Sequence, residues 1–221
     1  LGMKVLFVDD YGHALRYSAD YVLNQNVDAT DNMYAARTRA THLLLGTRYT
    51  LLRRAFRSHK PKKKTIAGKA SRLLITLGGA DPTNITAKAI EAVNHLPGIF
   101  TTVVIGGSNP HRIAMETLCK RNGMDSVVDV PNLRSLMEET DIAIAAGGTT
   151  SYELAFMGVP ALTLVIADNQ LAVAHGMRAA GASINLGRAG DVTPETLLKS
   201  VQELAMDRRK RERMSAAGRC L

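Results

Sequence analysis

The stretch IAIAAGGTTSYELAFMG, residues 142–158, decides the fold. Its first four residues are an apolar run of strand length, and Gly147-Gly148 ends that run. A short helix is predicted to follow through Phe156, with Gly158 closing it, because glycine is favoured just past a helix end. A buried strand, a glycine turn and a helix together predict one unit of an α/β sheet.

The same unit repeats from residue 72 onward. Predicted strands are Leu73–Leu77, Thr102–Ile105, Val127-Val128, Ile142–Ala145, Ala161–Ile166 and Ser183–Leu186. Predicted helices cover Asp81–Leu96, Asn109–Asn122, Leu133–Glu139, the segment ending at Phe156, Gln170–Ala180 and a last segment from Thr193. Nearly continuous apolar strands separated by helices imply a parallel sheet with helices on both faces. The predicted fold is therefore α/β, a Rossmann-type parallel sheet.

Residues 1–59 are less regular. They offer a strand at Lys4–Val8, apolar triplets at Tyr21–Leu23 and Leu43–Leu45, and a predicted helix at Tyr49–Phe56, too few elements for a complete domain. The charged, proline-interrupted segment that follows predicts a boundary. We expect a partial N-terminal α/β domain at 1–59, a basic linker at 60–70 and a nearly complete α/β domain at 71–221.

Composition limits the class of protein. The 221 residues hold 28 Lys and Arg against 20 Asp and Glu, a formal net charge of +8, and 46% are hydrophobic, which is enough for a core. The sequence contains no run of about 18 apolar residues, so it predicts no membrane span. The first residues lack the features of a signal peptide. Cys119 and Cys220 form neither a disulfide framework nor a zinc site and suit a reducing cytoplasm. We expect a cytoplasmic protein without metal or cofactor.

Three predicted strands end in glycine pairs: Gly78-Gly79, Gly106-Gly107 and Gly147-Gly148. Parallel strands bring such turns to one edge of the sheet, where glycine lets the backbone approach a ligand and helix N-termini favour anions. These turns predict a phosphate or diphosphate site, although each pair alone also fits a tight turn. Neither the dinucleotide-binding nor the P-loop glycine pattern is present.

The turn at 147–153 is the densest candidate site. Thr149 and Thr150 add hydroxyl donors beside the glycine amides, which suits phosphate oxygens. Glu153 has two interpretations. It stands three residues after Thr150, the spacing of a capping box, and spacing alone favours that interpretation. Its carboxylate also suits the two hydroxyls of a ribose.

Two further groups of polar residues follow predicted strands. Asp168, Asn169 and Gln170 would hydrogen-bond a sugar at the same edge of the sheet, or Asp168 and Asn169 would cap the next helix. His13 is the one histidine beside a glycine-bearing turn after a strand, which makes it a weak catalytic candidate.

Eight ordered motifs carry a resemblance to a known family: VDD (8–10), LNQN (23–26), LLGTRY (44–49), LLRRAFR (51–57), TLGGADPTN (76–84), IGGSNP (105–110), AGGTTSYELA (146–155) and ADNQ (167–170). Together they resemble the PseG/SpsG group, the UDP-2,4-diacetamido-2,4,6-trideoxy-β-L-altropyranose hydrolases of pseudaminic acid biosynthesis. That group is related to the MurG-like glycosyltransferases of GT-B fold.

The resemblance implies two Rossmann-like domains with a UDP-sugar in the cleft between them. Residues 147–150 would contact the diphosphate, Glu153 the ribose, and Asn169 and Gln170 the sugar. The implied reaction is metal-independent attack of water on the anomeric carbon with release of UDP. The family's base, a histidine in an N-terminal glycine-rich loop, has no counterpart here. The chain therefore resembles an N-terminally truncated member, expected to bind UDP weakly and not to hydrolyse the UDP-sugar.

Other functions stay open. A GT-B glycosyltransferase has the same nucleotide site, but a sugar hydroxyl replaces water as the nucleophile. A non-catalytic module binds the nucleotide sugar at this site and catalyses no reaction. Basic runs at Lys60–Lys64 and Arg208–Arg211 permit nucleic acid, but aromatic residues are only 5% and no recognition motif accompanies them. A UDP-sugar is the expected partner, and nucleic acid is not.

Overall fold

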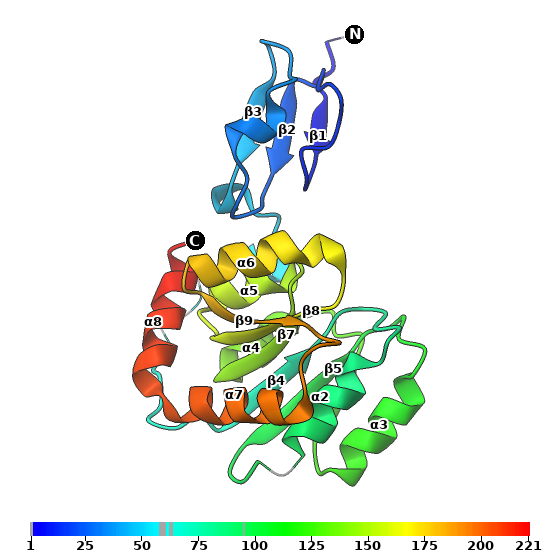
Figure 1. Cartoon of the computed structure of the whole chain (residues 1–221), viewed down its shortest axis with the longest axis vertical. Helices are drawn as coiled ribbons and strands as arrows, with labels where there is room; N and C mark the ends of the chain where they lie inside the picture. The colour runs from blue at the N-terminus through cyan, green and yellow to red at the C-terminus, as the bar shows by residue number, and fades with distance from the viewer. Residues whose placement is uncertain (1, 58–60, 62–63, 95) are drawn as a thin grey trace.

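The computed structural model describes residues 2–57, 61, 64–94 and 96–221 (Figure 1). The larger part is a six-stranded sheet in the order β6-β5-β4-β7-β8-β9, with every neighbouring pair parallel. Its strands are β4 (Arg72–Thr76), β5 (Phe100–Ile105), β6 (Asp125–Val128), β7 (Ile142–Ala146), β8 (Ala161–Val165) and β9 (Ser183–Arg188). The predicted α/β parallel sheet is confirmed.

Helices cover both faces of this sheet, as Figure 1 shows. They are α2 (Ile85–Val93), α3 (Arg112–Arg121), α4 (Leu133–Glu139), α5 (Thr150–Met157), α6 (Leu171–Ala179), α7 (Pro194–Met206) and α8 (Arg208–Arg219). The side chains of β4 alternate between two buried clusters. Leu73 and Ile75 pack with residues of α2, α3 and α7, whereas Leu74 packs with residues of α4 and α5. Each such buried side chain contributes about 1.5–3 kcal/mol relative to an exposed one.

The order of the strands creates a switch point between β4 and β7. From β4 the chain moves outward through β5 to β6, then returns to the other side of β4 as β7 and continues to β8 and β9. The turns after β4 and β7 therefore diverge to opposite faces and leave a crevice between them. Ligands of open α/β sheets bind in such a crevice.

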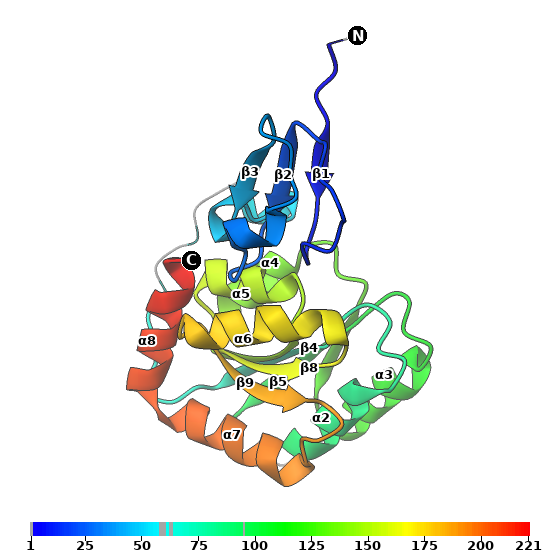
Figure 2. The same cartoon turned by 45° about the horizontal axis from the view of Figure 1, so that its top comes forward.

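The first part of the chain forms a separate three-stranded parallel sheet, β1 (Leu6–Val8), β2 (Tyr21–Asn24) and β3 (His42–Leu45). Short helical turns accompany it: η1 (Asp31–Tyr34), η2 (Thr47–Tyr49) and α1 (Arg54–Arg57). Figure 2 shows this small sheet beside α5 and α6. The two parts touch there, since the Tyr152 hydroxyl donates to Asn26 Oδ1 at 3.0 Å. A Cβ on Gly176 would lie 2.0 Å from the side chain of Val27, so glycine at 176 permits the close contact.

Several predicted helix bounds were wrong. The helix at Tyr49–Phe56 is reduced to one 3-10 turn and the four residues of α1, because the intervening segment forms hydrogen bonds with other elements. Helix α2 begins at Ile85 rather than Asp81, although the Asp81 carboxylate does accept from two amides of its first turn at 2.8 Å. The last predicted helix is two helices, because Asp207 ends α7 and caps α8.

Of the predicted linker 60–70, residues 60, 62 and 63 lie outside the described residues, and the proposed division of the chain stays a prediction. Within the described ranges, no helix has both the length and the apolar character that crossing a bilayer requires.

Candidate functional site

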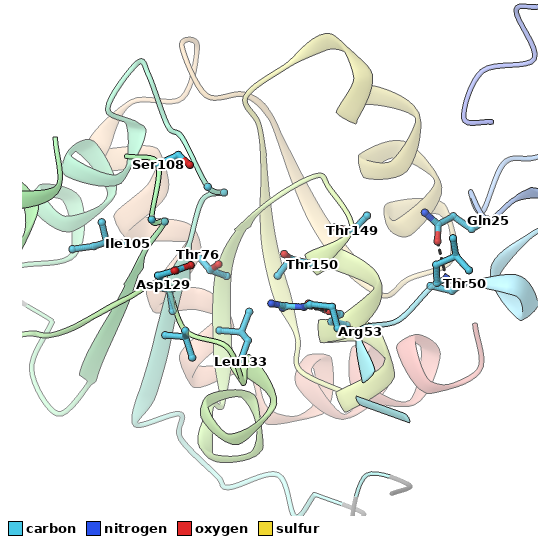
Figure 3. Close-up of a pocket in the computed structure, with 18 residues that line it drawn as sticks. Gln25, Thr50, Arg53, Thr76, Ile105, Ser108, Asp129, Leu133, Thr149 and Thr150 are labelled. Atoms are coloured by element: carbon cyan, nitrogen blue, oxygen red, sulfur yellow. Dashed lines mark hydrogen bonds and ion pairs between the residues drawn. The ribbon is translucent and has the colours of Figure 1, made fainter. Parts of the chain in front are cut away.

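A cavity of about 580 Å³ opens at the carboxyl edge of the larger sheet, at the switch point. The turns after four strands and the segment leaving the small sheet all contribute to it (Figure 3). Its lining residues are Gln25, Thr50, Leu51, Arg53, Thr76, Gly78, Gly79, Val104, Ile105, Gly106, Gly107, Ser108, Asp129, Val130, Leu133, Thr149, Thr150 and Glu153.

Two of the three glycine pairs line this cavity. Gly78 has a φ of +96°, which glycine adopts without strain, and a Cβ on Gly79 would meet nothing within 4 Å. Gly106 is required for packing, because a Cβ there would lie 2.1 Å from the carbonyl oxygen of Gly79. The Gly79 backbone is thus packed against Gly106, whereas the side of Gly79 on which a Cβ would stand is open.

The third pair does not line the cavity. Gly147 lies against the turn after β8, where a Cβ would approach the Gln170 carbonyl oxygen to 3.0 Å. Gly148 faces the side-chain amide of Gln170, 3.9 Å from a built Cβ. At these two positions, glycine lets the turns after β7 and β8 pack closely.

The N-terminus of α5 points its first residues into the cavity. Thr149 and Thr150 both line it, and neither hydroxyl has a hydrogen-bond partner among the described residues. The amides of Ser151 and Tyr152 already donate to the carbonyl oxygens of Gly148 and Thr149, at 2.9 and 3.1 Å. The start of a helix nevertheless carries a partial positive charge and favours an anion. This end of the cavity is therefore suited to phosphate oxygens.

Glu153 does not form the predicted capping box. Helix α5 begins at Thr150, its cap residue is Thr149, and no side chain caps the helix. The buried Glu153 carboxylate instead accepts from Arg53, whose Nε and Nη2 lie 2.6 and 2.5 Å from its two oxygens. This carboxylate raises the pKa of the Arg53 guanidinium. The capping interpretation, favoured by spacing, was wrong.

Sequence reasoning did not single out Arg53 or Gln25 as site residues. Arg53 is the one Lys or Arg among the described residues that line the cavity. The Gln25 side-chain oxygen accepts from the Leu51 amide at 2.8 Å and so holds the segment that carries Arg53. Both residues belong to motifs that carry the family resemblance. The site residues were predicted from glycine pairs and from polar residues that follow strands, and neither signal identifies Arg53 or Gln25.

Asp168, Asn169 and Gln170 form the 3-10 turn η3 (Asp168–Gln170), outside the cavity lining. Asp168 pairs with Arg188 at 2.6 Å, and Asn169 is exposed. The Gln170 side-chain oxygen accepts from the Ile166 amide at 3.0 Å. None of the three side chains caps α6. The structure thus separates these residues from the lining of the cavity.

His13 also lies outside the lining, on the turn after β1. Its ring is exposed, and Nδ1 lies 3.4 Å from a carboxylate oxygen of Asp9. Burial opposes ionisation of Asp9, but hydrogen bonds from the Tyr17 hydroxyl and the Gly12 amide outweigh it and lower the pKa of Asp9. Among the described residues, no group of three or more His, Cys, Asp or Glu could hold a metal ion.

The fold and the cavity define a Rossmann-like α/β protein with an anion-suited pocket at its switch point. Residues 52–219 match the family model described as "Glycosyltransferase family 28 C-terminal domain". The chain belongs to this family.

The individual relatives described next are each less than 30% identical to this chain. The spore coat polysaccharide biosynthesis protein SpsG of Bacillus subtilis is 28% identical over 204 residues, covering 90% of this chain and 59% of SpsG. Acinetobacter baumannii MurG aligns with a TM-score of 0.64 at 18% identity, over 99% of this chain and 62% of MurG. Spinosyn rhamnosyltransferase SpnG, complexed with thymidine diphosphate, aligns with a TM-score of 0.61 at 20% identity, over 89% of this chain and 50% of SpnG.

The relative and the family model confirm the predicted relationship to SpsG and to a glycosyltransferase family, and the solved structures share the fold. The chain spans 59% of the length of its curated relative SpsG.

Proposed function

We propose that this chain binds a nucleotide sugar, specifically a UDP-sugar, in the cavity at the switch point. The observation that carries this proposal is the start of α5, where two unpartnered threonine hydroxyls stand next to a buried carboxylate, Glu153. The phosphate oxygens of a diphosphate need hydrogen-bond donors such as the two threonine hydroxyls. The hydroxyls of a ribose need an acceptor such as the Glu153 carboxylate. The family match and the thymidine diphosphate bound by SpnG support this class of ligand.

In the proposed complex, the diphosphate contacts the hydroxyls and the backbone amides of Thr149 and Thr150. The exposed backbone of Gly79 offers a further approach from the neighbouring turn. Glu153 accepts hydrogen bonds from the ribose hydroxyls. Because a carboxylate has about four acceptor positions, Glu153 can accept from a ribose while it retains at least one bond from Arg53.

For the chemistry, we propose that the chain contributes to hydrolysis at the anomeric carbon with release of UDP, in the biosynthesis of a polysaccharide sugar such as pseudaminic acid. Glycosyl transfer is about as well supported, because the matched family is one of glycosyltransferases. In both reactions the bond from the anomeric carbon to the diphosphate oxygen breaks, and only the nucleophile differs, water or a sugar hydroxyl. No histidine lines the described cavity to accept the proton of either nucleophile.

A calorimetric titration with UDP and a UDP-release assay separate the alternatives. We expect saturable binding of UDP and no release of UDP from UDP-sugars by this chain. Release in water alone would favour a hydrolase active within these residues, and release only with an acceptor sugar would favour a transferase. If no uridine nucleotide binds at millimolar concentration, the proposed function is wrong. A Lys120→Ala variant, which removes an exposed charge on α3 outside the cavity, is the control for nonspecific charge.

A further inference from the structure

A second cavity, of about 570 Å³, lies between α8 and the segment 64–66 that leads into β4. It is lined by the described residues Lys64, Thr65, Ile66, Arg208, Glu212, Ser215, Ala216 and Arg219, and it shares none of them with the cavity at the switch point. The Lys64 ammonium donates to the carbonyl oxygen of Thr140, just before β7. Arg219 Nη2 donates to that of Met157, which precedes β8, at 3.4 Å. The second cavity therefore lies toward the amino edge of the larger sheet, away from the first.

This second cavity concentrates positive charge. The two basic runs of the sequence meet there, because Lys64 belongs to the first and Arg208 to the second. With Arg219 they supply three cations, and Glu212 is the one carboxylate among the described lining residues. Glu212 already accepts from Arg208 Nε at 2.8 Å. The lining thus carries two positive charges in excess, which suits a dianion.

The protein itself stabilises the Lys64 ammonium poorly. The side chain is half-buried, and the carbonyl oxygen before β7 is its one hydrogen-bond partner in the described ranges, so two of its three N–H groups can reach a ligand. Burial is the main cause that lowers the pKa of Lys64 from 10.5 to about 8. The carboxylates of Asp141 and Glu139 oppose this shift, whereas the guanidiniums of Arg219 and Arg72 add to it. A bound anion would restore the stability of the ammonium form.

The wall of the second cavity leaves space for polar groups. Gly158 ends α5 with a φ of +68°, and a Cβ there would lie 2.2 Å from Arg219 Nε and 2.7 Å from Ser215 Oγ. Glycine at 158 therefore lets the guanidinium and the hydroxyl keep their places. Ile66 and Ala216 add apolar surface to the lining. A cavity of this volume, apolar in part and with a few convergent polar groups, has the character of a small-molecule site.

We propose that the second cavity binds a dianionic phosphoryl group, either free or carried by a small organic molecule. Lys64 and Arg208 donate charge-assisted hydrogen bonds to it from two different segments of the chain, and such bonds are roughly twice as strong as neutral ones. The Ser215 hydroxyl offers a further donor. This inference goes beyond the proposed function and does not depend on it, because the two cavities have no described lining residue in common.

Acetylation of the Lys64 amine tests this site directly. The protein is treated with N-hydroxysuccinimidyl acetate at pH 8, and each lysine is followed by peptide mass spectrometry in inorganic phosphate, phenyl phosphate or sodium chloride at equal ionic strength. Only the neutral amine reacts, and a neighbouring anion raises the pKa of Lys64 by about one unit or more. Both phosphates should therefore slow its acetylation about fivefold or more, and chloride should not. Exposed Lys120, on α3, should react at the same rate throughout. Stronger protection by phenyl phosphate would identify an organic phosphate monoester as the ligand, and equal protection would identify phosphate itself.

Arg208→Gln and Arg209→Gln are a matched pair, because each removes one exposed charge from α8 and only Arg208 lines the second cavity. Arg208→Gln should need about tenfold more phosphate for the same protection of Lys64. Arg209→Gln should behave like wild type, and both should keep the wild-type melting temperature, since the pair that Arg208 forms with Glu212 is exposed.

Three results would overturn the inference: equal protection in the two variants, protection of Lys64 by chloride alone, or no acetylation of Lys64 without phosphate. Binding of UDP at the cavity of the switch point is measured separately. Its failure would overturn the proposed function and leave the result at Lys64 unaffected.

Discussion

The guanidinium of Arg53 donates from Nε and Nη2 to both carboxylate oxygens of Glu153, at 2.6 and 2.5 Å. The two residues are one hundred positions apart and join the segment that leaves the small sheet to the start of α5. Glu153 is buried, whereas about half of the Arg53 side chain is exposed on the cavity. A ligand that reaches Glu153 must therefore share the carboxylate with Arg53 or displace it.

Replacing Glu153 by alanine should weaken UDP binding at least tenfold, because the ribose loses its charged acceptor. The unfolding free energy should also fall, by about 1–2 kcal/mol, because a partly buried ion pair is lost. Calorimetry and urea denaturation measure the two effects. Glu116→Ala, which breaks an exposed pair with Arg112, is the control and should change neither. Unchanged UDP affinity with lower stability would leave Glu153 only its structural role.

Replacing Gly106 by alanine should destabilise the protein by about 1–3 kcal/mol, since the added methyl group overlaps backbone atoms of Gly79 rather than a movable side chain. UDP binding should weaken as the two turns separate. Gly79→Ala is the matched comparison, because a Cβ there meets no atom within 4 Å and its φ is not positive. Equal stability of the two variants, measured by urea denaturation, would contradict the packing explanation.

The sheet could be predicted from local sequence, but the partners of site residues could not. β4 and β7 are short apolar runs that end in glycine, and such patterns are local. Spacing alone assigned Glu153 to a capping box, because the competing partner, Arg53, is distant in the chain. Gln170 was predicted at the sugar, but its side chain accepts from the Ile166 amide, four residues away, and no sequence pattern marks this local contact. Nothing in the sequence marks Asp129 as a non-glycine residue with a positive φ, +47°, since aspartate is common in turns.

Replacing Arg211 by methionine should lower the unfolding free energy by about 3 kcal/mol or more. Its fully buried guanidinium donates to four backbone carbonyls, those of Ala67, Gly68, Leu204 and Ala205. Methionine fills much of the volume but leaves these buried acceptors unpaired. Arg209→Met, on the exposed side of α8, should change stability by less than about 0.5 kcal/mol. A loss below about 1 kcal/mol at Arg211 would indicate that water replaces the guanidinium.

Stability should also depend on pH through Cys119, because burial raises the pKa of its thiol from 9.0 to about 11. The folded state holds the proton more tightly than the unfolded state. This contribution to stability is therefore complete below pH 9 and is lost as the pH rises from 9 to 11. Urea denaturation of wild type and Cys119→Ala across this range should show a steeper decline for wild type. Parallel declines would contradict the assignment to Cys119. Consistent with a buried neutral thiol, iodoacetamide at pH 8 should modify exposed Cys220 and leave Cys119 unmodified until the protein unfolds.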